Sequence, residues 1–327
     1  MPPSDAVARV HAGVPALEPL AWLYGAGLAL SRALGARRRE PGPDNARVVA
    51  IGNLEAGGSG KTPLAMHLLA AAAAAGRSTA YVSRGYGSPA SHGPHVTLVL
   101  PRGGFYPDAA AGVRVLERDG RTEIEREAGD EAALVAEYEP RAIVALAAAK
   151  QRAVAVAVGL GADLVVVDDA FQSWTLARSV DVVLLDAARP LGSGRLLPAG
   201  TLRERPDALR RADVVVFNGA RHDADVAAAR EYVARWLSPR VTVLGMRRRI
   251  EMVGERKPAR VFVAVGVARP ERVAADLVAA GIEIAGAWSF PDHHAYRQAD
   301  AVAIAERAYA SGAEVVVTTE KDWVKMR

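Results

Sequence analysis

The 327-residue chain contains no cysteine. A disulfide framework, a thiolate metal site and a cysteine nucleophile are therefore excluded, and a reducing cytoplasm is the default compartment. The chain also lacks a large excess of either charge, because 41 basic and 37 acidic residues leave a net charge of only +4. This small excess does not predict a nucleic-acid partner. Half of the residues are hydrophobic, so the chain can bury a large core, and its length suits about two domains.

The N-terminal region lacks an apolar run long enough to span a bilayer. Residues 17–34 are rich in leucine and precede the arginines at 37–39, but Glu18 and Arg32 leave fewer apolar residues between them than the roughly 20 that a spanning helix needs. The basic start of a signal peptide is also missing. Two interpretations remain open: a helix packed on the protein, or a helix lying in the membrane interface with arginines near anionic headgroups.

Lysine is scarce too, at 5 of 327 residues, and one of them lies in the most informative stretch. The segment 53–62 follows an apolar run and precedes a helical pattern that ends at Gly76. A strand, a glycine turn and a helix form the layout of a phosphate-binding loop, in which backbone amides and the helix N-terminus face an anion. We predict that the phosphates of a nucleotide are bound by Gly57, Gly58, Ser59, Gly60, Lys61 and Thr62.

Within this loop, Lys61 is placed to reach the outer phosphates, and the Thr62 hydroxyl is placed to ligate Mg²⁺. The loop departs from the usual pattern because Glu55 stands where glycine is expected, and we expect Gly57 and Gly58 to supply the tight turn instead. Ala56 occupies the position at which partition-type ATPases carry a signature lysine. That substitution argues against a switch ATPase.

The alternation of strand and helix patterns predicts a doubly wound α/β sheet of the P-loop NTPase type, followed by a second, smaller α/β domain. We expect an N-terminal helix region at 1–40, a P-loop domain at 41–240 and the smaller domain at 241–327. The predicted strands of the larger domain are 46–52, 78–83, 162–168, 181–186 and 213–217. In the smaller domain we predict strands 241–246, 261–266, 283–288 and 314–318, and helices 270–280 and 297–310.

A more polar stretch near 88–128 interrupts the alternation. Asp119 and Gly120 lie between the apolar segment 113–115 and Ile124, a pattern typical of a β-hairpin. We therefore expect a β-excursion on the surface of the larger domain.

Two aspartates follow the apolar strand pattern 162–168. Ligands of open α/β sheets bind at the carboxyl ends of the strands, and a carboxylate there can hold Mg²⁺ beside the phosphate loop. Neighbouring side chains on a strand point to opposite faces, so we favour Asp169 over Asp168 as the direct ligand. Arg84 follows the strand 78–83 at the edge shared with the phosphate loop, so it is our first candidate for binding a substrate or nucleotide phosphate, ahead of the arginines at 195, 203 and 205.

Seven ordered motifs together resemble one family. They are Gly52-Asn-Leu54 with 57–63, Ser83-Arg-Gly-Tyr-Gly87, Gly129-Asp-Glu131, 168–172, 195–204, Phe290-Pro-Asp-His-His294 and Thr318-Thr-Glu-Lys-Asp322. The order and content resemble tetraacyldisaccharide 4'-kinase, the lipid A 4'-kinase of Gram-negative bacteria. The resemblance implies ATP-dependent phosphorylation of the 4'-hydroxyl of a tetraacylated disaccharide 1-phosphate. It also implies a peripheral or monotopic protein at the cytoplasmic face of the inner membrane, with the N-terminal helix at the membrane surface.

The same resemblance assigns removal of the acceptor proton to Asp130, assisted by His293. Such a pair is chemically sensible, because histidine can orient a carboxylate and relay a proton near neutral pH. The structural alternatives are that Asp130 caps a helix beginning at Glu131 and that His293 ends a turn.

Several positions depart from the family pattern. Ala170 and Ser173 replace an expected glycine and histidine, and the resemblance leads us to expect further residues beyond Arg327. Two other hypotheses remain: a nucleotide-dependent switch ATPase, against which Ala56 argues, and a catalytically impaired scaffold at the membrane, which Ala170 and Ser173 suggest.

Overall fold

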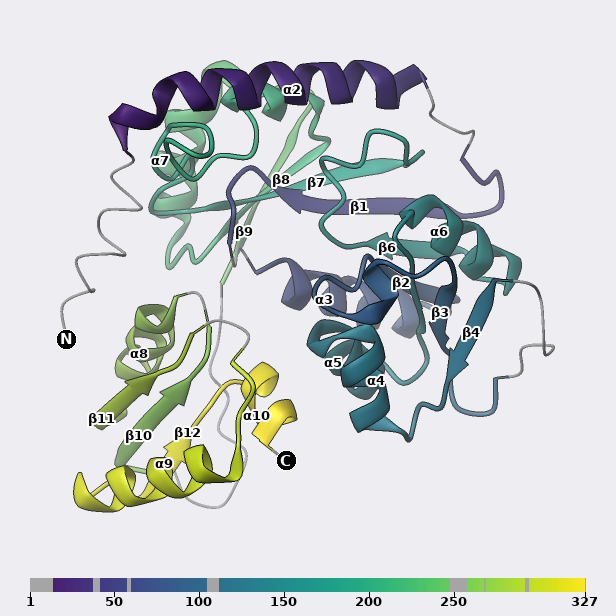
Figure 1. The fold of residues 1–327 in the computed structure, drawn as a ribbon. Helices are drawn as coiled ribbons and strands as arrows, with labels where there is room; N and C mark the ends of the chain where they lie inside the picture. Colours follow the sequence, from purple (N-terminus) through teal and green to yellow (C-terminus); the bar gives the residue numbers. More distant parts are fainter. Residues whose placement is uncertain are drawn as a thin grey trace. The chain divides into compact units, whose positions relative to one another are not determined.

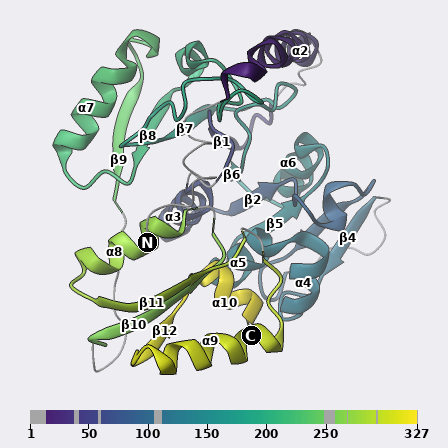
Figure 2. The same cartoon turned by 60° about the vertical axis from the view of Figure 1, so that its left-hand side comes forward.

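The computed structural model describes residues 14–37, 42–57, 60–104, 112–247, 258–267, 269–291 and 294–326. The chain divides into two compact units, Met1–Met246 and Arg247–Arg327. We describe each unit by itself (Figures 1 and 2).

The first unit is built on a nine-stranded sheet. Its strands are β1 (Arg47–Asn53), β2 (Thr79–Ser83), β3 (Val96–Val99), β4 (Val113–Leu116), β5 (Ile143–Leu146), β6 (Leu164–Val167), β7 (Val180–Asp186), β8 (Val214–Asn218) and β9 (Thr242–Met246). The order across the sheet is β4-β3-β5-β2-β6-β1-β7-β8-β9, and every neighbouring pair is parallel except β3 with β5. This mostly parallel sheet confirms the predicted α/β class.

Helices cover both faces of that sheet. The α-helices are α2 (Glu18–Arg37), α3 (Lys61–Ala74), α4 (Arg121–Ala128), α5 (Asp130–Tyr138), α6 (Lys150–Gly159) and α7 (Asp223–Val233). Helix α6 packs through Ala153, Val154 and Ala157 on the face that holds Val165 and Val167. Figure 1 shows α3 and α5 on the opposite side of the central strands. Because both faces are covered, strands such as β6 are continuously apolar, which is why the sequence pattern revealed them.

Short 3-10 turns complete the first unit. They are η1 (Pro15–Leu17), η2 (Pro89–Ser91), η3 (Pro206–Arg211) and η4 (Ala234–Trp236).

Two expectations for the first unit are wrong. The strand predicted at 241–246 does not open the smaller domain, since it is β9 and pairs with β8 at the edge of the large sheet. The hairpin predicted around Asp119-Gly120 is absent, because β4 pairs in parallel with β3 and the next residues form α4, which buries Ile124 to 1% exposure. Arginine and glutamate dominate α4 and favour a helix, so Asp119-Gly120 marks the start of that helix and not a hairpin turn.

Helix α2 lies on the outside of the first unit and has two different faces. One face packs on the unit: the Tyr24 hydroxyl donates to the Arg203 carbonyl at 3.1 Å, Gly35 lies against Trp174, and Glu18 forms an ion pair with Arg195. The opposite face exposes leucines at spacings of three, four and seven residues, namely Leu20, Leu23, Leu30 and Leu34. Figure 2 views α2 nearly end-on at the surface of its unit. None of the described helices is long and apolar enough to cross a membrane.

The second unit is a three-stranded parallel sheet in the order β11-β10-β12. Its elements are β10 (Arg260–Val265), α8 (Pro270–Ala279), β11 (Glu283–Ser289), α9 (Gln298–Ala310), β12 (Val315–Val317) and α10 (Glu320–Met326). Alternate residues of β10 enter two cores: Val261 and Val263 pack with Leu277 of α8, whereas Phe262 packs with Ile304 of α9. The predicted small α/β unit is therefore present.

The contact between α2 and Trp174 makes a testable pair of glycine substitutions. In Gly35→Ala the new Cβ would lie 2.4 Å from the Trp174 Cβ, so we expect a loss of about 1–3 kcal/mol of stability or release of the helix. In Gly27→Ala the Cβ meets nothing within 4 Å, and alanine should stabilise the helix by up to about 1 kcal/mol. Thermal unfolding and the rate of tryptic cleavage in α2 measure both effects. Equal behaviour of the two variants would show that α2 is not docked as described.

Candidate active site

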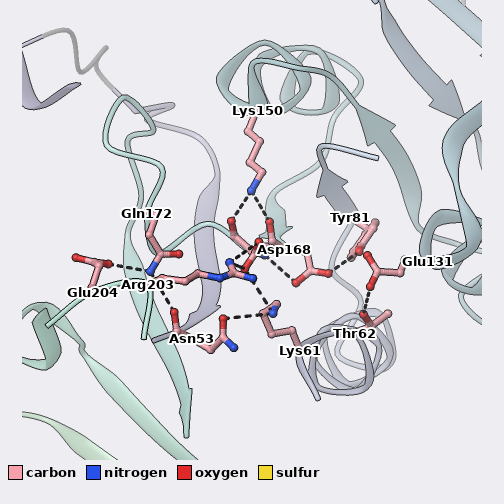
Figure 3. Close-up of polar contacts among 11 residues, drawn as sticks. Asn53, Lys61, Thr62, Tyr81, Glu131, Lys150, Asp168, Gln172, Arg203 and Glu204 are labelled. Atoms are coloured by element: carbon pink, nitrogen blue, oxygen red, sulfur yellow. Dashed lines mark hydrogen bonds and ion pairs between the residues drawn. The ribbon is translucent and has the colours of Figure 1, made fainter. Parts of the chain in front are cut away.

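The carboxyl ends of β1 and β6 are neighbours in the centre of the large sheet, and the polar residues gather there (Figure 3). The loop after β1 leads into α3, and the turn after β6 carries the two aspartates. Strand β2, on the other side of β6, ends at the same edge. Parallel strands thus bring residues that are more than a hundred positions apart to one edge, where open α/β sheets bind ligands.

The phosphate-binding loop has the local geometry that its sequence predicts. Gly57 and Gly60 have φ of 111° and 86°, and Gly60 caps helix α3, whose first two residues are Lys61 and Thr62. A Cβ on Gly60 would lie 2.4 Å from the Asn218 amide nitrogen, so glycine is required there. The predicted ligands Gly58 and Ser59 lie outside the described residues. Lys61 Nζ donates to Asn53 Oδ1 at 3.3 Å and lies 3.4 Å from Asp169 Oδ1.

Glu55, the departure from the usual loop pattern, has a structural role. Its carboxylate is buried and accepts a hydrogen bond from the Thr201 hydroxyl at 2.9 Å. The neighbouring Ala56 amide donates to the Thr201 carbonyl at 2.8 Å. A Cβ on Gly192 would overlap Glu55 Oε1 at 1.7 Å. Glu55 therefore fixes the start of the phosphate loop to the segment around 192–202.

The two aspartates have separate surroundings. Asp168 is 2% exposed, and its carboxylate accepts hydrogen bonds from the Tyr81 hydroxyl and the Asp169 amide, both at 2.8 Å. Asp169 is half-exposed, has φ of 47°, and accepts bonds from Arg203 at 2.8 Å on both carboxylate oxygens. Both residues lie in the turn after β6, so the left-handed turn, and not alternation along a strand, separates their side chains.

The charges around Asp169 set its protonation. Burial alone would raise the pKa of its carboxyl, but the positive charges of Lys61, Arg203 and Lys150 outweigh burial and lower the pKa to about 2. Burial and the neighbouring Asp168 raise the pKa of Tyr81 well above its ordinary value. Asp169 is therefore ionised and Tyr81 is a hydrogen-bond donor at neutral pH.

Lys150 belongs to this site and was not identified from the sequence. It is the first residue of α6, and its ammonium donates to the carbonyls of Asp168 at 2.8 Å and Asp169 at 2.5 Å. Burial lowers its pKa to about 8, although the two aspartates act in the opposite direction. The signal that could have identified Lys150 from the sequence is the scarcity of lysine. The strand that precedes it, β5, was also not predicted, so its position at the edge of the sheet was not recognised.

The Gly129-Asp130-Glu131 motif reaches the phosphate loop through its glutamate. Asp130 is the first residue of α5, and its carboxylate accepts the amide of the adjacent Glu131 at 3.0 Å, whereas the N-cap of α5 is Gly129 and has no side-chain cap bond. The Thr62 hydroxyl makes a long contact of 3.5 Å with Glu131 Oε1. Sequence reasoning assigned a role to Asp130 alone, whereas the structure adds Glu131 to the same site. His293, its predicted partner, lies outside the described residues.

The oxygen donors at this edge suit Mg²⁺. Thr62, Glu131 and Asp169 offer hydroxyl and carboxylate oxygens, the hard ligands that Mg²⁺ prefers. Among the described residues no group of three or more histidine, aspartate or glutamate side chains forms a ready metal cage. Mg²⁺ binds one or two carboxylates together with phosphate oxygens and water.

The four candidate arginines have different positions. Arg84 is exposed after β2, and its charge is close enough to lower the pKa of Lys150. Arg195 pairs with Glu18 of α2, and Arg205 lies 4.0 Å from Asp207 at the surface. Only Arg203 bonds directly to a predicted metal ligand.

Behind these charges, a second layer of contacts joins the turn after β6 to the segment before η3. Gln172 donates to the Asn53 carbonyl at 3.1 Å and to Glu204 at 2.8 Å, and Arg211 completes a bidentate pair with Glu204 at 2.9 and 3.1 Å. Ala170, one of the departures from the family pattern, is fully buried and donates its amide to the Ile51 carbonyl at 2.8 Å.

Comparisons with known proteins agree with this geometry. The family model described as tetraacyldisaccharide-1-P 4'-kinase (LpxK) matches residues 14–327. A tetraacyldisaccharide 4'-kinase of Anaeromyxobacter dehalogenans (strain 2CP-C) is 39% identical over 295 residues, covering 86% of this chain and 72% of the relative. The one from Parvibaculum lavamentivorans is 34% identical over 311 residues, covering 95% and 81%. A crystal structure of "apo" form LpxK from Aquifex aeolicus in complex with ATP has a TM-score of 0.66 at 25% identity, covering 95% of this chain and 89% of that one.

The contact between Arg203 and Asp169 predicts a measurable change in titration. In Arg203→Met the carboxylate loses two charge-assisted hydrogen bonds, so the pKa of Asp169 should rise from about 2 towards its ordinary value. Ionised Asp169 contributes stability that is present above its unfolded-state pKa and is lost as the pH falls through the folded-state pKa, so in the variant this contribution should be smaller and its pH window narrower. Carbon-13 NMR of the aspartate carboxyls measures the shift. Arg205→Met, at the exposed neighbour, is the control, and an unchanged Asp169 in Arg203→Met would contradict the assignment.

Proposed function

This chain belongs to the tetraacyldisaccharide-1-P 4'-kinase family, and we propose that the edge formed by β1 and β6 is where it transfers the γ-phosphate of ATP to the 4'-hydroxyl of the lipid disaccharide. The protein is an ATP-dependent kinase of lipid A biosynthesis. No comparison favours the switch ATPase or the scaffold.

One observation carries the proposal for the site. The ammonium of Lys61 lies 3.4 Å from the carboxylate of Asp169, although Lys61 follows the loop after β1 and Asp169 lies in the turn after β6. A lysine of a phosphate loop next to a carboxylate that suits a metal is the pair that phosphoryl transfer needs. Arg203 and Lys150 add positive charge at the same point.

Each side chain has a distinct proposed task. Phosphoryl transfer has a loose transition state, so positioning and charge neutralisation dominate, and Lys61 with the loop amides supplies both. Bound Mg²⁺ would neutralise phosphate charge, held by Thr62 and Asp169, with Glu131 as a further oxygen ligand. Asp168, which is bonded to Tyr81, supports the turn from behind.

Removal of the acceptor proton remains assigned to Asp130, with His293 as its partner. Asp130 precedes Glu131, and Glu131 contacts the Thr62 hydroxyl, so the motif is anchored beside the phosphate loop. A carboxylate there is within one residue of the proposed metal site, which supports its action on a hydroxyl that attacks the γ-phosphate.

A cavity between α2 and the rest of the first unit is the proposed place of the lipid. It has a volume of about 510 Å³ and lies between small residues of α2, such as Ala21 and Gly25, and the segment that includes Leu196 and Arg205. Both polar and apolar groups line it, as an acylated sugar phosphate requires. The segment 194–208 that forms its floor also carries Arg203, which reaches the nucleotide edge.

We also propose that the exposed leucine face of α2 lies in the membrane surface. Leu23 and Leu30 are 70% and 62% exposed on the side away from the protein, and Arg37 ends the helix. A helix with one apolar face and basic residues binds the interface of anionic membranes. This would place the enzyme peripherally at the cytoplasmic face of the inner membrane, beside its lipid substrate.

Transfer to the lipid tests the site. Purified protein, Mg-ATP and tetraacyldisaccharide 1-phosphate should give a product one phosphate heavier, detected by mass spectrometry. We expect Lys61→Ala to lose transfer by about a thousandfold and Asp130→Asn by about a hundredfold or more, since charge neutralisation and proton removal contribute on those orders. Asp119→Asn, at an exposed aspartate, is the matched control. Lipid-independent ATP hydrolysis would instead support the switch, and inertness towards both substrates would support the scaffold.

Vesicle binding tests the membrane face. Leu23→Glu with Leu30→Glu should weaken sedimentation with anionic phospholipid vesicles and raise the KM for vesicle-borne lipid, because it removes buried apolar area and adds negative charge. ATP affinity should stay the same. Val278→Glu with Val302→Glu, at residues that are 61% and 54% exposed in the second unit, is the control. Unaltered sedimentation of the α2 variant would refute this part of the proposal.

A further inference from the structure

The turn that carries Asp169 has a disfavoured backbone conformation. In the described parts of the chain Asp169 is the one non-glycine residue with positive φ, at 47°. L-residues avoid this left-handed region because Cβ crowds the backbone, so the surrounding structure must hold Asp169 there. The conformation aims its carboxylate at Arg203 and Lys61, while the preceding Asp168 carboxylate turns towards Tyr81.

One side chain bonds to the backbone of this turn on both sides of Asp169. The Lys150 ammonium donates to the carbonyl of Asp168 at 2.8 Å and to the carbonyl of Asp169 at 2.5 Å. Successive carbonyls of an extended strand point in opposite directions, so they could not both reach one ammonium. The two bonds therefore require a helical-type turn at Asp169 and stabilise it against an extended one.

Lys150 occupies an unfavourable place for a cation. It is the first residue of α6, at the positive end of the helix dipole, and it is largely buried. Within the described ranges no carboxylate forms an ion pair with it, and its hydrogen bonds go to the two carbonyls of the turn. Figure 3 shows Lys150 reaching the turn from the side opposite to Lys61.

We propose that Lys150 is a positioning residue, which holds the Asp168–Asp169 turn in its left-handed form and so keeps the Asp169 carboxylate facing the metal and phosphates. Nothing in this role requires Lys150 to touch the nucleotide. The inference rests on the proposed role of Asp169 as a Mg²⁺ ligand.

Nucleotide binding with and without metal gives the first test. Isothermal titration with ATP should be done at a Mg²⁺ concentration that saturates the wild type. Under that condition Lys150→Met should bind ATP about tenfold more weakly than the wild type, because residues that orient metal ligands affect metal-dependent binding on this order. In EDTA the affinity should stay within about twofold, because Lys61 and the loop amides are intact. Equal losses in both conditions would show that Lys150 contacts phosphate directly and would overturn the proposal.

Two variants act as controls. Lys150→Arg should retain Mg-ATP affinity within about threefold, because the guanidinium can donate to both carbonyls. Arg152→Met, on the same helix, removes a bond to the Pro94 carbonyl at the surface and should leave affinity unchanged. Thermal melting checks folding, and Lys150→Gln replaces Lys150→Met in the same titrations if the methionine variant does not fold.

A double-mutant cycle separates positioning from direct action. If Lys150 acts only through Asp169, adding Lys150→Met to Asp169→Asn should weaken Mg-ATP binding by no more than about twofold beyond Asp169→Asn alone. If the double variant instead lost Mg-ATP affinity by the product of the two single-variant losses, the proposal would be overturned. These titrations need no phosphoryl transfer, so a protein that binds Mg-ATP normally but leaves the lipid unmodified would refute the proposed function and not this inference.

Discussion

The contact on which the rest of the site depends is the convergence of Lys61, Arg203 and Asp169 at the carboxyl ends of β1 and β6. Opposite charges that lie half in the protein attract each other strongly, because water screens them only in part. Here they also link three separate segments of chain: the phosphate loop, the turn after β6 and the segment before η3. The same positive groups that hold the carboxylate are those that an incoming triphosphate would attract.

That third segment connects the nucleotide edge with the surface that we assign to the lipid. Thr201 bonds to Glu55 at the start of the phosphate loop, and Arg203 bonds to Asp169. On the other side, the Arg203 carbonyl accepts the Tyr24 hydroxyl of α2. The helix that we propose for the membrane surface and the loop that we propose for phosphate binding are therefore only one short segment apart. If these proposals hold, a water-soluble nucleotide and an acylated acceptor would meet on one unit.

Particular residues show how far sequence reasoning reached. The runs that became β1, β2 and β6 were readable because both faces of these strands are buried, and Gly60 and Lys61 were readable because a phosphate loop needs glycine geometry before a helix. Residues 113–124 were misread as a hairpin, since Asp-Gly precedes a helix as readily as it closes a turn. The strand at 242–246 was predicted, but the sheet to which it belongs was not. The hydrophobic periodicity of a strand does not indicate which other strand it pairs with.

The sequence by itself determined the α/β class, the phosphate loop, the aspartate pair and the family, because each depends on local pattern or on motifs in order. Only the tertiary structure decided which groups meet: that Glu55 bonds to Thr201, that Glu131 contacts Thr62, and that Lys150 bonds to the backbone of the turn at Asp169. The physical reason is that a parallel sheet brings the ends of distant strands together, and the strand order that does so is set by packing across the whole core.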